Sequence, residues 1–297
     1  MTFIGKGIYH IFHAHSADVR MAINSDAKVI GYHSWKDLPD HMWLIEPVEG
    51  SNDTFTVRNL ASGNYLDLTD GSKTDGASVY CRASAGGNNQ KWIIKRDEHQ
   101  EPRKESLWKM QNEASKTFAD LYGGGPHLTP VVGWQGSWTE AESIGRTRQW
   151  IFECISQTTS QIRTTLNASP HVQQNFPSFN GDALYLVLSP ERLYSIWEGT
   201  DLGSTQSRVE IFDSDDFALV FKAEVAKWGN KTFKADGFGI LCGMMFSSKA
   251  DNNGKAISYA YNWSLEVKDP SKVVFFEAHN GKISHEVDGY KAYFGLY

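Results

Sequence analysis

The sequence is poor in cysteine, in clustered positive charge and in long apolar runs, and each shortage excludes a class of protein. Cys81, Cys154 and Cys242 are widely spaced and odd in number, so neither a disulfide framework nor a zinc site is indicated. No apolar run approaches the ~18 residues of a membrane span, so we expect none. The first residues lack the basic segment, apolar run and cleavage site of a signal peptide, so we expect a cytoplasmic protein.

The charge balance argues against nucleic acid as a partner. The formal net charge is −6 at pH 7, and Lys and Arg form no cluster along the chain, whereas nucleic-acid phosphates require a basic surface. The chain instead has 13% aromatic residues, including ten Trp, and 26 Gly. This composition favours strands joined by tight turns. A chain of 297 residues is long enough for two domains that each bury a core.

One pattern recurs three times in the first half of the chain, and its copies are called here the first, second and third repeats. Each ends in a closing Trp, at Trp43, Trp92 and Trp150, so the Trp recurs after 49 and then 58 residues. Three strand-sized segments precede the closing segment of each repeat. The opening segments are residues 7–11, 55–59 and 107–112, the next are 20–23, 65–68 and 118–121, and the third are 29–33, 78–82 and 131–135.

Four strand-sized segments in each of three repeats predict twelve strands. No helical periodicity is found before about residue 155. The pattern therefore predicts an all-β domain with pseudo-threefold symmetry over residues 1–155.

The closing segment resembles the Gln-x-Trp motif of the ricin-type β-trefoil lectins. The match is complete at Gln90-Lys91-Trp92, whereas His41 and Arg148 stand at the Gln position of the other repeats. The resemblance implies a β-trefoil in which the closing Trp side chains form the core. It also implies that sugars are bound by an Asp on an early strand, an aromatic or polar mid-repeat side chain, and Asn, Gln or His near the closing motif. Carboxylates accept sugar hydroxyls and aromatic rings cover the apolar face of galactose.

These positions are unequally filled, and the third repeat is the best candidate for a carbohydrate site. It has Asp120, the aromatic Trp134 and the polar Gln135. In the first repeat Tyr32 and His33 are present, but Ala22 stands at the Asp position. We therefore expect the first repeat to bind weakly or not at all.

The second repeat keeps the polar groups of a carbohydrate site, namely Asp67, Arg82, Asn89 and Gln90. Its aromatic position is assigned to Cys81. The neighbouring Tyr80 replaces the missing ring only if the backbone turns, because adjacent strand residues face opposite ways.

Each of these residues also has a purely structural interpretation. Asp67 and Asp120 are alternatively solvated charges at strand ends, and we expect Asp70 and Asp75 in their Gly-rich turn to form Asx hydrogen bonds. The closing Trp side chains are expected in the core.

From about residue 156 helices and strands alternate irregularly, which predicts an α+β domain over residues 156–297. Residues 160–176 predict a helix that ends at Pro177, residues 183–188 a buried strand, and Ser189-Pro190-Glu191 the start of a second helix. A third helix is expected from Asp213 through about Trp228, with acidic residues at its start. Strands are expected at 237–245, 257–267, 273–277 and 290–297.

The whole chain resembles the mushroom chimerolectins, in which a ricin-type trefoil precedes a papain-like domain. The resemblance is carried by residues 213–217, 260–263, 274–277 and 290–297. It implies a homodimer formed through the C-terminal domain and, in some members, a calcium-dependent cysteine protease.

The sequence departs from that family at the catalytic positions. The Cys nucleophile falls on Ser214 and the His base on Tyr259, while Glu277 keeps the carboxylate; a family Trp falls on Ser207. A hydroxyl needs an adjacent strong base to become a nucleophile, and Tyr is not a base near neutral pH. We therefore expect a pseudo-protease domain that is retained for dimerisation and no enzymatic activity.

Two alternatives stay open in this domain. A serine hydrolase could use Ser214 with His279 or His285 as its base. Three neighbouring carboxylates are the candidate calcium ligands, or else cap the helix as solvated charges: Asp213, Asp215 and Asp216. Cys242 lies in an apolar run and is expected to be a buried structural thiol.

The sequence thus predicts a dimeric lectin that cross-links galactose-containing glycans of glycoproteins or glycolipids. The terminal sugar is either α-linked galactose or sialylated galactose, since family members differ between the two. No cofactor is required for such binding, and calcium is the one candidate ion. The alternative function is a lectin-targeted hydrolase that uses Ser214.

Overall fold

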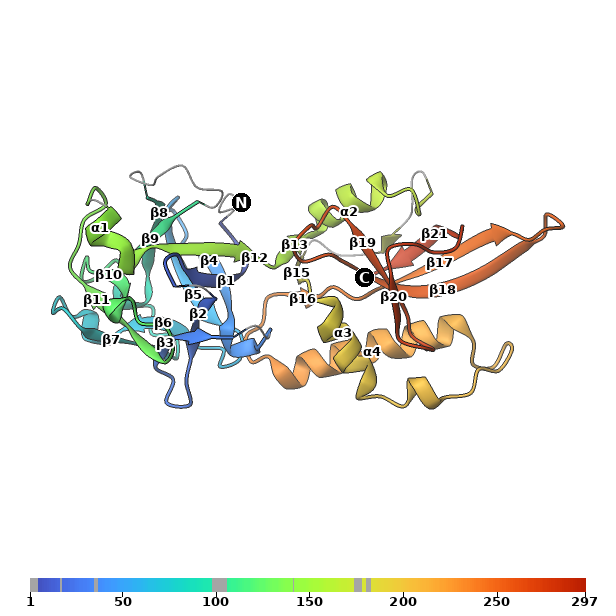
Figure 1. The fold of residues 1–297 in the computed structure, drawn as a ribbon, viewed down its shortest axis with the longest axis horizontal. Coiled ribbons are helices and arrows are strands. Elements are labelled where there is room, and N and C mark those ends of the chain that lie inside the picture. Colours follow the sequence, from blue (N-terminus) through green and yellow to red (C-terminus); the bar gives the residue numbers. More distant parts are fainter. Residues whose placement is uncertain are drawn as a thin grey trace. The chain divides into compact units, whose positions relative to one another are not determined.

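The computed structural model describes residues 5–16, 18–34, 37–97, 106–140, 142–173, 178–179 and 183–297. The chain divides into two compact parts. The trefoil domain holds the chain through Cys154 together with Phe233–Asp236, and the C-terminal domain holds Ile155–Thr232 and Gly237–Tyr297. Strands dominate the first domain, whereas the second combines helices with sheets (Figure 1). Among the described residues, no helix is both long and apolar enough to span a bilayer.

Six of the described strands of the trefoil domain close into a ring. Strand β1 pairs with β4, β4 with β5, β5 with β8, β8 with β9, β9 with β12, and β12 with β1. Each repeat contributes its opening and closing strands, so the ring is a closed barrel. Its strands are β1 (Gly7–His13), β4 (Met42–Pro47), β5 (Thr54–Asn59), β8 (Trp92–Arg96), β9 (Trp108–Asn112) and β12 (Trp150–Cys154).

The two middle strands of each repeat form a hairpin, and the three hairpins meet through β11, which pairs with both β3 and β7. Barrel and hairpins together confirm the predicted β-trefoil. The hairpin strands are β2 (Val19–Ile23), β3 (Val29–His33), β6 (Tyr65–Leu68), β7 (Ala77–Arg82), β10 (Phe118–Leu121) and β11 (Thr129–Trp134). Short turns complete the domain: η1 (Pro39–His41), η2 (Thr69–Gly71), η3 (Asn88–Gln90), η4 (Tyr122–Gly124), α1 (Glu142–Gly145) and η5 (Arg146–Arg148).

The closing Trp of each repeat is fully buried and makes the same hydrogen bond. Indole nitrogens of Trp43, Trp92 and Trp150 donate to backbone carbonyls at 2.8, 2.9 and 3.0 Å. The acceptors are equivalent hairpin residues, namely Met21, Leu66 and Ala119. A buried indole N–H needs such a partner, so each Trp fixes its hairpin to the barrel. The predicted core role of these three residues is confirmed.

The C-terminal domain is α+β, as predicted. One sheet has the order β13-β15-β16 and the other the order β14-β21-β17-β18-β19-β20. Its strands are β13 (Ser156–Thr158), β14 (Ser178–Phe179), β15 (Leu184–Leu186), β16 (Gly239–Ile240), β17 (Gly243–Ala250), β18 (Ala256–Leu265), β19 (Val273–Glu277), β20 (Lys282–Ser284) and β21 (Lys291–Leu296). Its helical segments are α2 (Thr159–Ala168), α3 (Pro190–Glu198), η6 (Leu202–Ser204) and α4 (Ser214–Thr232).

Helix α4 lies against the six-stranded sheet and buries the apolar side of its sequence. Phe217, Phe221 and Val225 are buried along it. The buried amide of Asn262 on β18 donates to the carbonyl of Ala218 at 2.8 Å. This bond and the apolar contacts hold the start of α4 beside β18, which brings together the positions that resemble a protease site.

Three predicted boundaries in this domain are wrong. Helix α2 ends at Ala168 rather than 176, because Ser169 precedes Pro170 and is extended; residues 174–177 lie outside the described ones. Helix α4 continues past Gly229 to Thr232. The single strand expected over 237–245 is two strands, β16 and β17, in different sheets.

Candidate functional site

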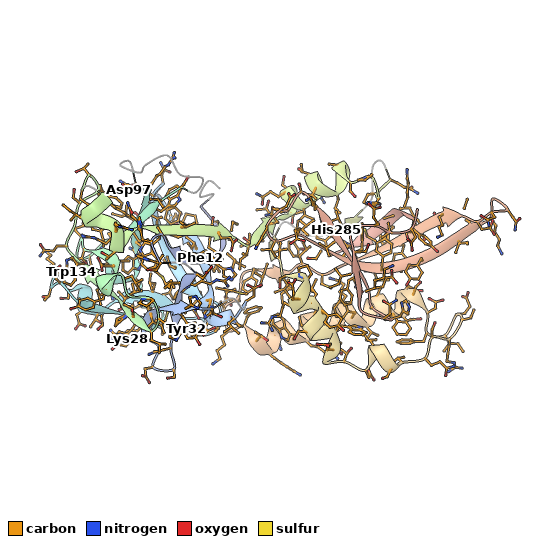
Figure 2. All side chains as sticks on the ribbon, viewed as in Figure 1. Phe12, Lys28, Tyr32, Asp97, Trp134 and His285 are labelled. Atoms are coloured by element: carbon orange, nitrogen blue, oxygen red, sulfur yellow. The ribbon has the colours of Figure 1, made fainter. Side chains whose placement is uncertain are left out.

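Strand pairing in the hairpins aligns the three repeats residue by residue. Ala22 lies opposite Ile30, Asp67 opposite Tyr80, and Asp120 opposite Val132. Two residues further along the second strand of each hairpin lie Tyr32, Arg82 and Trp134. Residues two apart on a strand share a face, so these three side chains lie on the same face as the Asp position. Figure 2 labels Tyr32 and Trp134 on the trefoil domain.

The assignment of Cys81 to the aromatic position of the second repeat is wrong by one residue. Cys81 pairs with Leu66 and is buried in the core. Its equivalent in the third repeat is Gly133, which pairs with Ala119, and not Trp134. The hairpin loop of the second repeat is one residue longer than that of the third. Because a one-residue shift exchanges the two faces of a strand, the ring position belongs to Arg82.

Tyr80 consequently faces the same side as Asp67 without any turn of the backbone. The guanidinium carbon of Arg82 lies 5.4 Å from the centre of the Tyr80 ring, which is within the range of a cation–π contact. The second repeat therefore presents an Arg supported by a Tyr where the other repeats present a ring.

Asp67 anchors the polar residues predicted for the second repeat. Its Oδ2 accepts hydrogen bonds from the side-chain amides of Asn89 and Gln90, both at 2.9 Å. Arg82 Nη1 lies 3.7 Å from Asp67 Oδ1; the Arg82 side chain is 46% exposed and that of Asp67 only 3%. The four predicted residues thus come together, with Arg82 outermost.

Gln90 has a scaffold role as well. Its amide nitrogen also donates to the carbonyl of Ala83 at 2.8 Å, and its amide oxygen accepts from the backbone N–H of Ala85 at 2.9 Å. These bonds tie the strand end at Arg82 to the closing turn, which explains why Gln-x-Trp is retained here.

Asp120 is the corresponding carboxylate of the third repeat. Its Oδ2 accepts from the hydroxyl of Thr147 at 2.6 Å and lies 3.5 Å from Arg148 Nε. Burial raises the pKa of Asp120, although Thr147 and Arg148 oppose the shift. Thr147 takes the place that Asn89 has in the second repeat.

Two aromatic rings of the third repeat lie against each other. The ring centres of Tyr122 and Trp134 are 5.9 Å apart, at 54° to each other. Tyr122 is 53% exposed and Trp134 is half-buried. Sequence reasoning missed Tyr122, although it follows Asp120 by two residues and so could have been found as a neighbour on the same hairpin.

Gln135 joins the third repeat through its backbone. Its N–H donates to Asp75 Oδ1 at 2.6 Å, and its carbonyl accepts from Arg148 Nη1 at 2.7 Å. Asp75 belongs to the hairpin turn of the second repeat, so the neighbouring repeat supplies a group to this site. Asp75, which was expected to form Asx hydrogen bonds in its own turn, therefore also accepts a hydrogen bond from the third repeat.

Arg148 replaces Gln90 as the scaffold residue of the third repeat. It is buried, and Nη1 also lies 3.3 Å from Glu140 Oε2. The ammonium of the buried Lys109 lies 3.5 Å from Glu140 Oε1 and from Asp97 Oδ2. A buried charge needs such partners, and this network lets the third repeat keep its geometry without Gln.

The C-terminal domain places Ser214 and Tyr259 beside the same small cavity. Ser214 is the first residue of α4, and its Oγ accepts from the backbone N–H of Ala260 at 3.1 Å. A small cavity of about 110 Å³ lies there. Its lining comprises Ser207, Ser214, Phe217, Tyr259, Ala260, Ala278 and His279.

Tyr259 cannot act as the missing base. Burial, together with the negative charge of Glu277, raises the pKa of Tyr259 to about 12. Its hydroxyl lies 3.3 Å from Nδ1 of His279, and Nε2 of that His is 3.1 Å from the amide of Asn280. The structure describes no hydrogen bond between Ser214 and His279.

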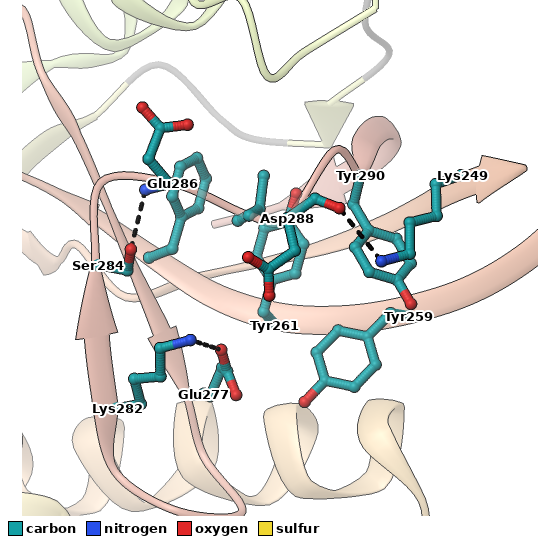
Figure 3. A pocket seen from close by; sticks show the side chains of 11 residues that line it. Lys249, Tyr259, Tyr261, Glu277, Lys282, Ser284, Glu286, Asp288 and Tyr290 are labelled. Atoms are coloured by element: carbon teal, nitrogen blue, oxygen red, sulfur yellow. Dashed lines mark hydrogen bonds and ion pairs between the residues drawn. The ribbon is translucent and has the colours of Figure 1, made fainter. Parts of the chain in front are cut away.

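Glu277 and His285 are both engaged elsewhere. Glu277 pairs with Lys282 at 3.3 Å in a neighbouring cavity of about 250 Å³ that Tyr259 also lines (Figure 3). His285 Nδ1 is 3.1 Å from the carbonyl of Val273 and lines neither cavity. Of the two histidines considered as alternative bases, only His279 is near Ser214.

The three candidate calcium ligands gather at the start of α4. Asp213, Asp215 and Asp216 each offer a carboxylate oxygen within 4.8 Å of the others. Asp216 Oδ2 also accepts from the Asp213 N–H at 3.2 Å, and Asp213 Oδ1 from the Asp215 N–H at 3.4 Å. The oxygen donors suit a hard cation, and the side chains of Asp213 and Asp216 also cap the helix.

Both domains of the chain are similar to those of known lectins. A family model described as ricin-type beta-trefoil lectin domain-like matches residues 3–81 and 39–134, and one described as agglutinin C-terminal matches residues 185–283. No curated protein matches. The solved PSL1a–E64 complex is 42% identical, and Polyporus squamosus lectin bound to the epitope Neu5Acα2-6Galβ1-4GlcNAc is 43% identical. Both alignments cover 100% of each chain with a TM-score of 0.87.

Proposed function

Because the chain belongs to the family of lectins that join a ricin-type β-trefoil to an agglutinin C-terminal domain, we propose that it binds galactose-containing glycans. The observation that carries this proposal is the repeated pairing of a hairpin Asp with a hydrogen-bond donor from the closing turn. It occurs as Asp67 with Asn89 and as Asp120 with Thr147. Polyporus squamosus lectin, 43% identical over its whole length, is described as bound to a sialylated galactose epitope.

The third repeat is suited to a galactose ring. Trp134 and Tyr122 offer aromatic faces for the apolar side of the sugar, and Asp120 with Thr147 offers polar groups for its hydroxyls. Such shallow sites bind weakly one at a time, so several in one molecule raise the avidity.

The second repeat favours a glycan that carries negative charge. Arg82 stands where the third repeat has Trp134, and its side chain is 46% exposed. A guanidinium binds carboxylates strongly and in a defined geometry. Sialylated galactose therefore suits this repeat, with Asn89 beside it.

Agglutination of red cells and its inhibition by free galactosides tests the proposal. We expect Trp134→Ala to weaken inhibition by neutral galactosides, and Arg82→Ala to weaken selectively the binding of sialylated glycans on an array. Asp70→Asn is the matched control, because Asp70 lies on an exposed turn of the same domain. Failure of the wild-type chain to retain any galactose-containing glycan would refute the proposal.

We further infer that the C-terminal domain is not a protease. Ser214 Oγ already accepts a hydrogen bond from the Ala260 N–H, Tyr259 stays protonated near neutral pH, and Glu277 is paired with Lys282. No residue of this set can take a proton from the Ser214 hydroxyl. We expect no cleavage of casein, with or without calcium.

A serine hydrolase is the second candidate function, because His279 lines the same small cavity as Ser214. Both ring nitrogens of His279 have polar neighbours in Tyr259 and Asn280, so the ring would have to turn before it could accept the Ser214 proton. Casein cleavage that is abolished by both Ser214→Ala and His279→Gln would establish this function and overturn the pseudo-protease proposal.

A further inference from the structure

The larger cavity of the C-terminal domain, of about 250 Å³, is called here the tyrosine cavity. Asn262 on β18 faces α4, because its side-chain amide donates to the carbonyl of Ala218. Side chains alternate along a strand, so Tyr259 and Tyr261 of β18 face the other side of the sheet and line the tyrosine cavity. The cavity therefore lies on the face of the six-stranded sheet that α4 does not cover.

Four aromatic rings form a continuous wall of the tyrosine cavity. Tyr259, Tyr261 and Phe275 come from the sheet, and Tyr290 comes from the segment between β20 and β21. The ring centres follow one another at 5.6 Å from Tyr290 to Tyr259, 6.4 Å from Tyr259 to Tyr261, and 5.2 Å from Tyr261 to Phe275. Figure 3 shows the three tyrosines around the cavity. The π-faces of such rings attract positive charge.

Acidic residues outnumber basic ones among the described residues that line the cavity. Glu277, Glu286 and Asp288 are acidic, whereas Lys249 and Lys282 are basic, so three negative charges face two positive ones. The side chain of Glu286 is 81% exposed, and Asp288 is exposed as well, so these two acids lie where solvent reaches the cavity. This excess of negative charge attracts a cation and repels an anion.

Lys249 shows how a cation is held in the tyrosine cavity. Its ammonium lies 4.2 Å from the centre of the Tyr290 ring and donates to the backbone carbonyl of Asp288 at 3.1 Å (Figure 3). A ring face and an oxygen acceptor together are a favourable environment for an ammonium group. Because Lys249 uses the carbonyl of Asp288, the carboxylate of that residue is not the acceptor of this bond.

The hydroxyl of Tyr261 is a second acceptor in the cavity. Tyr261 is only 2% exposed, and among the described residues its hydroxyl has no hydrogen-bond partner. The Ser247 hydroxyl donates instead to the carbonyl of Tyr259 at 2.6 Å. Burial raises the pKa of Tyr261 to about 12, so the hydroxyl stays neutral. A buried hydroxyl without a partner is unfavourable, and a ligand that supplies a donor relieves this.

From these contacts we propose that the tyrosine cavity binds a primary alkylammonium group, carried either by a free amine or by a lysine side chain. An ammonium has three N–H donors, for which the Asp288 carboxylate and the Tyr261 hydroxyl are acceptors. The aromatic wall contacts the alkyl chain and attracts the charge. A volume of about 250 Å³ suits a short chain, because pockets for drug-sized ligands begin at about 300 Å³. The site is independent of the glycan sites in the trefoil domain.

Ligand-observed NMR titration of the full-length chain at constant ionic strength tests the proposal. Butylammonium represents a free amine and the peptide acetyl-Ala-Lys-Ala-amide a lysine side chain, while 1-butanol and butyrate are the neutral and anionic controls. We expect at least one of the two ammonium probes to bind at least tenfold more tightly than both controls. Binding of butylammonium alone identifies a free amine as the source of the ligand, and binding of the peptide alone identifies a lysine side chain.

Two substitutions that act in opposite directions separate loss of the site from loss of the fold. We expect Asp288→Asn to weaken binding at least fivefold, and Asn tolerates the φ of 46° at this position. Lys249→Met should strengthen binding at least fivefold, because it removes a like charge from the cavity. Glu198→Gln, at an exposed position of α3 outside the cavity, makes the same charge change as Asp288→Asn and should leave the affinity unchanged.

Three results would overturn the proposal. The first is the absence of binding by both ammonium probes, or binding no tighter than that of 1-butanol. The second is an affinity that neither Asp288→Asn nor Lys249→Met changes, since the ammonium would then lie elsewhere on the chain. The third is displacement of the bound probe by free galactose in the Lys249→Met variant, which would identify the tyrosine cavity as a sugar site.

Discussion

Single side chains in the trefoil domain have both a binding and a structural role. Asp67 is buried, and two side-chain amides depend on it as acceptor, so it organises the closing turn before any sugar arrives. Among the residues that the structure describes, the Asp40 carboxylate has one side-chain contact, with His41 Nε2 at 3.8 Å. Substitutions at these two acids should therefore have different consequences for stability.

We expect Asp67→Ala to lower the free energy of unfolding by about 1–3 kcal/mol, because the half-buried amide of Asn89 and the buried amide of Gln90 lose this acceptor. Asp40→Ala should cost less than about 0.5 kcal/mol, as is usual for substitutions at accessible sites. Urea unfolding followed by Trp fluorescence measures both. Equal costs would show that Asp67 does not organise the turn.

Stability at acid pH depends on a second buried residue, His13. Burial and the neighbouring His15 lower the pKa of His13 to about 4, and its Nδ1 lies 2.9 Å from Ser16 Oγ. In the unfolded chain His13 is protonated near pH 6.5, whereas in the folded chain it is protonated only near pH 4. Stability should therefore fall as the pH drops through this window, by at most about 3 kcal/mol.

Replacing His13 by Gln removes this titration. We expect the thermal midpoint of the His13→Gln variant to change less between pH 7 and pH 4.5 than that of the wild type. His285→Gln, at a half-exposed position in the C-terminal domain, is the control for the replacement of a histidine outside the trefoil domain. Parallel profiles for wild type and His13→Gln would contradict the assignment.

At the scale of elements, the hairpins explain which parts of the sites could be predicted. The closing Trp residues and the alternating segments identified the strands, because they are local and period two is easily read. The register of the second hairpin could not be predicted, because Cys81 and Arg82 are adjacent and only the pairing of β6 with β7 decides which of them faces the site. The contributions of Asp75 and His127 could not be read at all, because closure of the threefold structure brings them to a neighbouring repeat.

The start of helix α4 shows the same limit in the C-terminal domain. Sequence identified the helix and its acidic first turn, but the approach of Ser214 to the Ala260 backbone depends on the docking of α4 against β18. The pKa of Asp213 is lowered and that of Asp215 is raised, because the two carboxyl groups share a hydrogen bond. A bound cation would stabilise this crowded arrangement.

We therefore expect millimolar calcium to raise the thermal midpoint of the C-terminal domain above its value in EDTA, because an ion that binds only the folded state stabilises it. Asp215→Asn should remove the rise while leaving both backbone caps intact, since the caps are made by side chains of Asp213 and Asp216. A calcium response that is absent in the wild type would leave these residues with the capping role alone.

At the scale of the whole molecule, cross-linking of cells requires that one assembly carry at least two glycan sites that bind glycans on different cells. We propose that the chain dimerises through its C-terminal domain. This domain exposes large apolar side chains, which are often found at protein interfaces. They include Val209 and Ile211 on a loop, Leu219 on α4, and Tyr293 and Phe294 on β21.

Light scattering of the intact chain at micromolar concentration should give twice the mass of one chain. Val209→Asp tests the exposed loop residues, and Phe294→Asp tests the exposed residues of β21. We expect one of these two variants to be monomeric. In that variant the affinity for a monovalent galactoside should be unchanged, because every trefoil site is intact. Agglutination should nevertheless need about 10²-fold more protein, because the avidity of paired domains is lost. A monomeric wild type that still agglutinates cells would show instead that the repeats of one trefoil suffice to cross-link glycans.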